Sequence, residues 1–399
     1  MIFYIMRNRI ILLLSVFFQM AGGISFFTYY PRFLSALGAD NSLISFIISM
    51  ISLASFIFPS LIGFFSDKFQ TRNWFIRFGI IGIIINAIFI FFIGIEYIWI
   101  CFPLIFINGF FFSCFGMTYP LFSEICLNDA KWISYYNAVV ASAWFFGSFF
   151  CGIYIDLIGI ENLFYYYFSF LVISFVFTLF IKENREEIFK LNRSLKQNNL
   201  LNVDLEKIQH DNMLNKISPS LYFALFFRNF GVRPIFNVLA IFFALTLTSD
   251  TEIGFLISIN YLLQIAISVI IGKIINKKNM KFILILGFLF STFAMLGYYF
   301  SRDFWGFLIS QFLVSFSYAA FWTATFIYIS QKTTPENKGR YVGMANSFFS
   351  LGNFTGNIFI GILLIINDNF YFTILVLFLF PTISVLFILF GFKSTKKKV

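Results

Sequence analysis

Runs of about 20 apolar residues recur about twelve times along this chain, with short polar or charged breaks between them. A helix of that length crosses a lipid bilayer. The sequence is 60% hydrophobic and only 12% charged, a balance that no soluble domain of this size needs. The runs do not alternate between polar and apolar residues, which excludes a β-barrel. The chain is therefore predicted to be an all-α integral membrane protein.

The breaks between the apolar runs predict twelve transmembrane helices. The first run begins near Ile10 and continues without a small-residue cleavage site, so we expect an uncleaved first helix and not a signal peptide. The expected spans are 10–34, 42–65, 75–95, 98–121, 134–156, 162–181, 219–247, 252–272, 281–300, 304–330, 341–366 and 369–391.

The 28 lysines and arginines predict the orientation in the membrane. If the N-terminus is cytoplasmic, only Arg32 and Arg302 fall in outside loops, while Arg228 and Arg233 fall within a span. All the others face the cytoplasm, as the positive-inside rule requires. We therefore expect a multi-pass protein of the plasma membrane with both termini cytoplasmic. The net charge of +10 then reflects contact with the anionic inner leaflet, and no nucleic-acid partner is expected.

The second half of the chain repeats the first at an offset of 209 residues. Gly63 recurs as Gly272, and Gly147 with Gly152 recurs as Gly356 with Gly361. Such a repeat within a membrane chain is typical of transporters, whose solute site lies between the two halves. The repeat predicts two six-helix bundles, residues 1–181 and 219–399, joined by a polar cytoplasmic linker, residues 182–218.

The sequence lacks the motifs of a membrane enzyme. It has no P-loop, GxSxG or HExxH motif, and its only histidine, His210, lies in the linker. The cysteines do not have metal-ligand spacing. We therefore expect no catalytic residues, no metal and no cofactor. Asp67 with Lys68 and Arg72 imitates an enzymatic cluster, so a multi-pass enzyme remains an alternative, as does a non-transporting solute sensor. An enzyme would leave the repeat unexplained.

The stretch from Gly63 to Arg72, with Asp67 and Lys68 between them, resembles the G-x-x-x-D-[RK]-x-G-R-[KR] loop of the major facilitator superfamily. Gln70 and Thr71 depart from the family pattern. The resemblance covers nearly the whole chain. It implies twelve helices in two parallel repeats, alternating access of a small solute to a central cavity, and a monomer in the bilayer.

The same loop predicts a cytoplasmic gate. Gly63 permits close helix approach, and Asp67 is expected to contact a helix N-terminus or a basic side chain, closing the two halves on that side. A basic turn that only sets the topology is the other interpretation. The residues assigned to this gate are Gly63, Asp67, Lys68, Arg72, Gly272, Asn276, Lys277 and Arg340.

Glycines also mark close helix packing beyond the gate. Residues 335–340 are followed by Gly343, Gly352, Gly356 and Gly361, which resemble the family's eleventh helix and predict a tightly packed face. The fifth span contains no proline, and the glycine–proline motif carried by many antiporters is therefore absent. Its absence argues against a drug–proton antiporter.

The distribution of charge within the spans indicates whether transport is coupled to protons. None of the 18 carboxylates falls in the middle of a span, and the nearest, Glu124 and Asp156, are expected at the rims. A proton-coupled carrier usually needs such a group within the bilayer. The sequence therefore favours uniport or exchange. A proton-coupled sugar, nucleoside or drug transporter of the same fold is the alternative.

Arg228 and Arg233 lie about 13 and 20 Å along the seventh span. A cation at that depth is costly unless it faces water or a partner. We expect Arg233 to face the cavity and bind an anionic group of the solute, because a guanidinium matches carboxylate and phosphate geometry. Arg228, beside Asn229, is expected to make a packing contact. Pro234 is expected to kink the helix.

Polar and aromatic residues of the first, fourth, seventh and tenth spans, which the resemblance places around the cavity, complete the predicted binding site. As a group they suit a small organic solute with hydrogen-bonding groups and an apolar or ring portion. The candidates are Gln19, Tyr29, Asn108, Arg233, Asn237, Tyr318 and Trp322, with Gln264 and Asn353 from neighbouring spans.

Overall fold

The computed structural model describes residues 2–69, 71–126, 130–183, 217–276, 278–333 and 335–392. Over these ranges the chain forms helices and short connections, without a strand. The first half comprises α1 (Ile2–Ala36), α2 (Asn41–Lys68), α3 (Asn73–Phe92), η1 (Ile95–Ile100), α4 (Cys101–Phe115), α5 (Thr118–Ile125), α6 (Ala130–Ile158), η2 (Ile160–Asn162) and α7 (Leu163–Leu179). The second comprises α9 (Pro219–Asn237), α10 (Leu239–Ala244), α11 (Asp250–Ile274), α12 (Met280–Phe300), α13 (Phe304–Lys332), α14 (Pro335–Ile366), α15 (Phe370–Leu377), α16 (Leu379–Leu386) and η3 (Phe387–Gly391).

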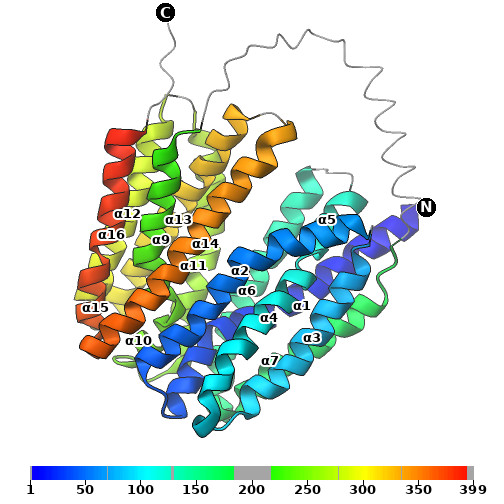
Figure 1. The fold of residues 1–399 in the computed structure, drawn as a ribbon, viewed down its shortest axis with the longest axis horizontal. Coiled ribbons are helices and arrows are strands. Elements are labelled where there is room, and N and C mark those ends of the chain that lie inside the picture. Colours follow the sequence, from blue (N-terminus) through cyan, green and yellow to red (C-terminus); the bar gives the residue numbers. More distant parts are fainter. Residues whose placement is uncertain are drawn as a thin grey trace, which may run out of the picture.

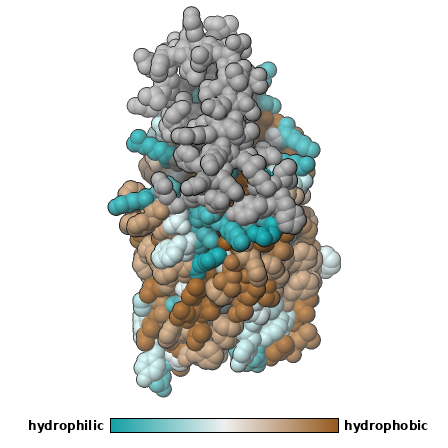
Figure 2. Space-filling model, turned by 90° about the vertical axis from the view of Figure 1, so that its right-hand side faces the viewer, coloured by the Kyte–Doolittle hydropathy of each residue, from teal (hydrophilic) through white to brown (hydrophobic). Residues whose placement is uncertain are grey.

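The helices are long and apolar enough to cross a bilayer. Eleven segments of the described chain meet that criterion. The twelfth span is formed by α9 and α10, where Arg228 and Arg233 interrupt the apolar sequence. The predicted all-α fold with twelve spans is confirmed. On the face in Figure 2, apolar side chains fill the middle of the molecule and hydrophilic side chains gather toward one end.

Several spans are interrupted rather than continuous. The fourth span turns at Gly116 between α4 and α5. The seventh breaks at Val238, whose backbone leaves the helical region (φ −116°, ψ 17°). The break lies four residues beyond Pro234, which has no N–H to donate and whose ring crowds the preceding turn. The proline stays inside α9, and the helix ends one turn later.

The repeat in the sequence is also a repeat of helix contacts. A Cβ added to Gly147 of α6 would overlap the Ala21 carbonyl oxygen of α1. At the matched positions, 209 residues later, a Cβ on Gly356 of α14 would overlap the Phe230 carbonyl oxygen of α9. In both halves, therefore, glycine brings the fifth helix against the backbone of the first. Gly352 makes a further such contact with α9, whereas Gly343 meets nothing within 4 Å.

The two groups of helices, here called the N-half (α1–α7) and the C-half (α9–η3), lie side by side. They pack through α2 against α14 and through α6 against α11, with a third contact between α1 and α10. The end that carries Arg72, Lys278 and Arg340 is called the basic end, and the other the closed end. In Figure 1 the halves converge at the closed end, at the bottom, and diverge toward the basic end.

Four residues, Tyr29, Arg32, Asp156 and Asp250, hold the halves together at the closed end and are called the closed-end latch. The Asp156 carboxylate accepts hydrogen bonds from the backbone N–H groups of Asp250 and Thr251, each at 2.7 Å. These are unpaired donors of the first turn of α11, where the helix dipole also favours a negative charge. Arg32 forms an ion pair with Asp250, and the Tyr29 hydroxyl donates to the Asp250 carbonyl oxygen at 3.0 Å.

The other polar contacts between the halves run along α2 and α14. Asn41 donates to the Asp368 carboxylate at 3.0 Å, and Asn357 donates to the Ser52 hydroxyl at 3.3 Å. The Ser249 hydroxyl of the C-half also donates to the Asp156 carboxylate, at 2.7 Å.

This arrangement corrects one expectation for the gate glycines. Gly63 and Gly272 do not bring helices together, since a Cβ at either position would find no atom within 4 Å. Both lie near the basic end of α2 and α11, where the halves diverge. Close approach at these positions would require the basic end to close.

The glycine contacts predict a position-specific effect on stability. Gly352→Ala is expected to lower the free energy of unfolding by about 1–3 kcal/mol, because its Cβ would overlap the α9 backbone. Thermal unfolding in detergent measures this effect. The matched control is Gly343→Ala, on the same helix but in open space. Equal melting temperatures for the two variants would contradict the packing role.

The latch predicts a shift in conformation. Asp156→Ala removes the acceptor of two α11 N–H groups, and we expect the closed end to open about tenfold more often. Nitroxide labels at Tyr97 and Trp305, both exposed at that end, would report a longer distance by pulsed electron resonance. The control is Asp303→Ala, because Asp303 caps α13 within the C-half alone, through Gly306 N–H at 2.8 Å. Unchanged distances in Asp156→Ala would refute the latch.

Candidate functional site

A cavity of about 350 Å³ lies between the two halves, beyond the closed-end latch. Its size is within the range of small-molecule sites, about 300–1,000 Å³. The N-half lines it with Met20, Gly23, Ile24, Phe27, Thr28, Ile48, Ile51, Ser52, Ser55, Phe112 and Trp144. The C-half lines it with Arg228, Arg233, Phe236, Asn237, Leu239, Ala240, Ile257, Asn260, Tyr261, Gln264, Val314, Tyr318, Phe349, Ser350 and Asn353.

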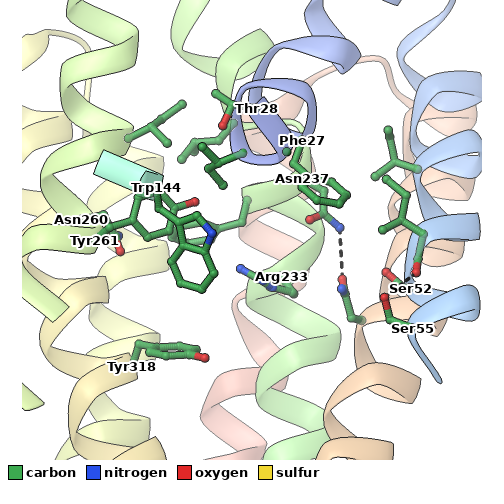
Figure 3. Close-up of a pocket in the computed structure, with 18 of the residues that line it drawn as sticks. Phe27, Thr28, Ser52, Ser55, Trp144, Arg233, Asn237, Asn260, Tyr261 and Tyr318 are labelled. Atoms are coloured by element: carbon green, nitrogen blue, oxygen red, sulfur yellow. Dashed lines mark hydrogen bonds between the residues drawn. The ribbon is translucent and has the colours of Figure 1, made fainter. Parts of the chain in front are cut away.

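Arg233 is a half-buried cation in the lining of this cavity. It lies on α9 four residues before the helix ends, and its side chain points into the space between the halves (Figure 3). Its guanidinium carbon lies 5.9 Å from the centre of the Phe349 ring, and its Nε has no hydrogen-bond partner among the described residues. An unpaired guanidinium in a largely apolar cavity is costly unless water or an anion compensates it.

Arg228 also borders the cavity but is bound to the protein. It is 2% exposed, donates from Nε to Ser291 at 3.1 Å and from Nη1 to Asn229 at 3.0 Å, and stacks on Phe321 at 4.6 Å. The predicted packing contact with Asn229 is therefore present. Neither acceptor is charged, so the positive charge of Arg228 has no counter-charge among these contacts. Among the described residues that line the cavity, two are arginines and none is Asp or Glu.

Two clusters of amides flank the arginines. Asn237 donates to Asn353 at 3.1 Å and to Asn357 at 3.0 Å, which joins α9 to α14; Figure 3 draws a hydrogen bond from Asn237. On α11, Asn260 donates to Gln311 at 2.6 Å and accepts from Gln264. These bonds fix the positions of the amides before any solute arrives, which lowers the entropy cost of binding.

The structure separates the predicted binding residues into two groups. Arg233, Asn237, Gln264, Tyr318 and Asn353 line the cavity, as expected from the sequence. The others do not line it in this structure: Gln19, Tyr29, Asn108 and Trp322.

Each residue of the second group has another environment. Tyr29 is fully buried in the closed-end latch, so its expected role in the cavity is replaced by a contact between the halves. Gln19 and Asn108 are buried at 1% and 5% exposure, inside the N-half. The centre of the Trp322 ring lies 6.0 Å from that of Tyr318 and 5.0 Å from that of Phe349, two residues that do line the cavity.

The aromatic wall of the cavity was not predicted. Phe27, Phe112 and Trp144 come from the N-half, and Tyr261 lies 5.4 Å from Trp144 across the boundary between the halves. With 65 phenylalanines in the chain, an aromatic residue carries little positional information. Trp144 and Tyr261 lie on the fifth and eighth spans, outside the four helices from which most candidates were chosen.

The gate residues of the N-half form a network at the basic end. Arg72 forms ion pairs with Asp67 at 2.8 Å and with Glu124 at 2.9 Å. Burial alone would lower the pKa of Arg72, but the bonds to Glu124 and Asp67 outweigh it and raise the pKa above its ordinary value. The Glu183 carboxylate accepts from the N–H groups of Arg72 and Asn73 at the start of α3. Asp67 itself is largely exposed.

The gate residues of the C-half are separate from this network. The Asn276 side chain accepts from the N–H groups of Lys278 and Asn279 and so closes its own turn. Arg340 is exposed on α14, and Lys277 lies outside the described residues. The two sets of predicted gate residues are thus both at the basic end, and no hydrogen bond or ion pair joins their described members.

The fold is shared with solved transporters. A family model described as "MFS_1 like family" matches residues 10–374. The nucleoside transporter NupG is 14% identical with a TM-score of 0.76 over 97% of this chain and all of that one. The xylose transporter XylE from E. coli is 13% identical with a TM-score of 0.72 over 99% and 98%. The human organic anion transporter MFSD10 is 15% identical with a TM-score of 0.61 over 96% and 99%.

No curated protein sequence matches this chain. The solved structures, all under 25% identical, establish the fold, and the family model spans nearly the whole sequence. The cavity between two repeated six-helix halves is the arrangement expected of such a carrier. The chain therefore belongs to the MFS_1 like family of the major facilitator superfamily, and it is a multi-pass membrane transporter of a small solute.

Proposed function

We propose that the protein transports a small organic anion across the plasma membrane by alternating access, with Arg233 as the anion-binding group. The observation that carries this proposal is the unpaired Arg233 in a cavity whose described lining residues include no carboxylate. An anionic group placed there would accept charge-assisted hydrogen bonds from the guanidinium. Arg228 adds a second positive charge to the same wall.

The moving parts would be the halves formed by residues 1–181 and 219–399, joined by the linker 182–218. With both termini cytoplasmic, as the positive-inside rule favours, the basic end faces the cytoplasm. The closed-end latch would then block the outside, and this structure would represent the inward-facing state. The protein would work as a monomer and as a carrier, not as an enzyme, and without a nucleic-acid partner.

A proton-coupled sugar or nucleoside carrier is the runner-up. XylE and NupG, which are named as xylose and nucleoside transporters, share the fold. The part of the lining that the structure describes lacks a carboxylate that would bind and release a proton within the bilayer. Uniport or exchange of the anion therefore fits the residues better.

Substitution of Arg233 is expected to weaken anion binding. Arg233→Gln is expected to weaken binding of an anionic solute about 10- to 100-fold, because a charge-assisted hydrogen bond is lost. Arg233→Lys should also weaken binding, about tenfold, since an ammonium cannot form the bidentate pair. Dissociation constants come from ligand-induced shifts in melting temperature. Arg302→Gln, at a cation outside the cavity lining, is the control. Unchanged affinity in Arg233→Gln would exclude the anion role.

Substitution of Asp67 is expected to change the rate of transport and not the affinity for the solute. Asp67→Asn should slow uptake severalfold while leaving membrane insertion and solute affinity intact, because Asp67 is proposed to close the basic end and does not touch the cavity. Uptake into proteoliposomes measures the rate. Asp40→Asn, at the start of α2 and without a side-chain capping bond, controls for removal of a charge. Normal uptake by Asp67→Asn would show that this loop only sets the topology.

A further inference from the structure

The two walls of the cavity differ in chemistry. The C-half supplies both arginines and every carboxamide of the lining. The N-half supplies mainly carbon: Phe27, Phe112 and Trp144, with Met20 and Ile24 beside them. The C-half also contributes four aromatic side chains, Phe236, Tyr261, Tyr318 and Phe349. A solute in this cavity therefore contacts aromatic rings on both sides, but arginines and carboxamides on the C-half side alone.

Two of the three hydroxyl groups in the described N-half lining form hydrogen bonds within the protein. The Ser52 hydroxyl accepts from Asn357, and the Ser55 hydroxyl donates to the Ile51 carbonyl oxygen of its own helix at 2.8 Å. The Trp144 side chain lines the cavity and points into the space beside Arg233 and Tyr261 (Figure 3). This wall offers mainly apolar surface, with the Trp144 indole N–H and the hydroxyls of Thr28 and Ser52 as its donors.

We infer that the solute is an aryl carboxylate or a similar aromatic anion, whose charged group binds Arg233 on the C-half and whose ring packs against Phe27, Phe112 and Trp144 on the N-half. This inference rests on the proposed anion transport and names its substrate class. A small hydrophilic anion would leave the aromatic wall uncovered. A polyol would bury hydroxyl groups against carbon, where each unpaired group is costly.

The asymmetry also assigns different roles to the two halves. The charged group can bind when only the C-half contacts it, whereas the ring gains the contacts with Phe27, Phe112 and Trp144 only when the N-half also surrounds it. Closure of the halves around the solute would therefore be stabilised by burial of the ring, at about 25 cal/mol per Å² of apolar surface. A ligand promotes closure only through contacts that are stronger in the closed state. The aromatic ring fulfils that condition here.

The test compares matched ligands on the purified full-length protein. Benzoate, phenylacetate, 4-hydroxyphenylacetate and indole-3-acetate are each compared with the corresponding alcohol and amine, and with acetate, lactate, succinate and citrate. Affinities come from shifts in melting temperature. We expect at least one aryl acid to bind about tenfold or more tightly than its alcohol, its amine and every non-aromatic acid.

The outcomes separate this inference from the proposed function. Succinate or citrate binding as tightly as the best aryl acid, through Arg233, would overturn the aromatic class and keep the anion carrier. Alcohols or amines binding as tightly as the acids would overturn both. If no member of the panel binds, the aryl class is rejected.

Matched variants test where the aromatic ring of the solute binds. Trp144→Leu is expected to weaken the best aryl acid about tenfold and to leave the affinity for the small acids unchanged, whereas Arg233→Gln should weaken both. Trp305→Leu, at an exposed tryptophan at the closed end, controls for the substitution. Phe27→Leu provides a second probe of the same wall if Trp144→Leu does not fold. Unaltered aryl-acid affinity in both wall variants would refute the placement of the ring.

Discussion

The hydrocarbon interior of a bilayer offers no hydrogen-bond partner, and this constraint governs where the chain places its polar groups. Each buried polar group must find its partner inside the protein or face an aqueous cavity. In the described chain, the polar contacts that join the halves gather at the closed-end latch and along α2 and α14. The remaining deep cation, Arg233, has no partner for its Nε. The paired groups of the latch hold the halves together at the closed end, whereas Arg233 lies in the cavity between them.

The sequence predicted the fold well because membrane spans and repeats are long-range signals that do not depend on side-chain detail. The offset of 209 residues reappears as matched contacts, with Gly147 against Ala21 and Gly356 against Phe230. The interruptions within the membrane-spanning helices were harder to predict. The turn at Gly116 and the break at Val238 depend on local backbone geometry that the apolar pattern does not reveal.

The cavity was predictable only in part. An arginine deep within a span is rare and costly, so Arg233 could be recognised from the sequence alone. Tyr29 could not be assigned correctly, because its partner Asp250 is 221 residues away and belongs to the other half. The same is true of the Asp156 contact with the start of α11. Such contacts depend on the conformational state, which a sequence does not specify.

Under the proposed function, the unpaired charge of Arg233 also affects how readily the empty carrier returns to its starting conformation. When the halves close around an empty cavity, Arg233 loses access to water without gaining a counter-charge, and that desolvation costs several kcal/mol. A bound anion removes this cost, so the loaded carrier reorients faster than the empty one. A carboxylate in the cavity would neutralise Arg233 in the empty state, but the described lining has none. This cavity therefore favours exchange of one anion for another over net uniport.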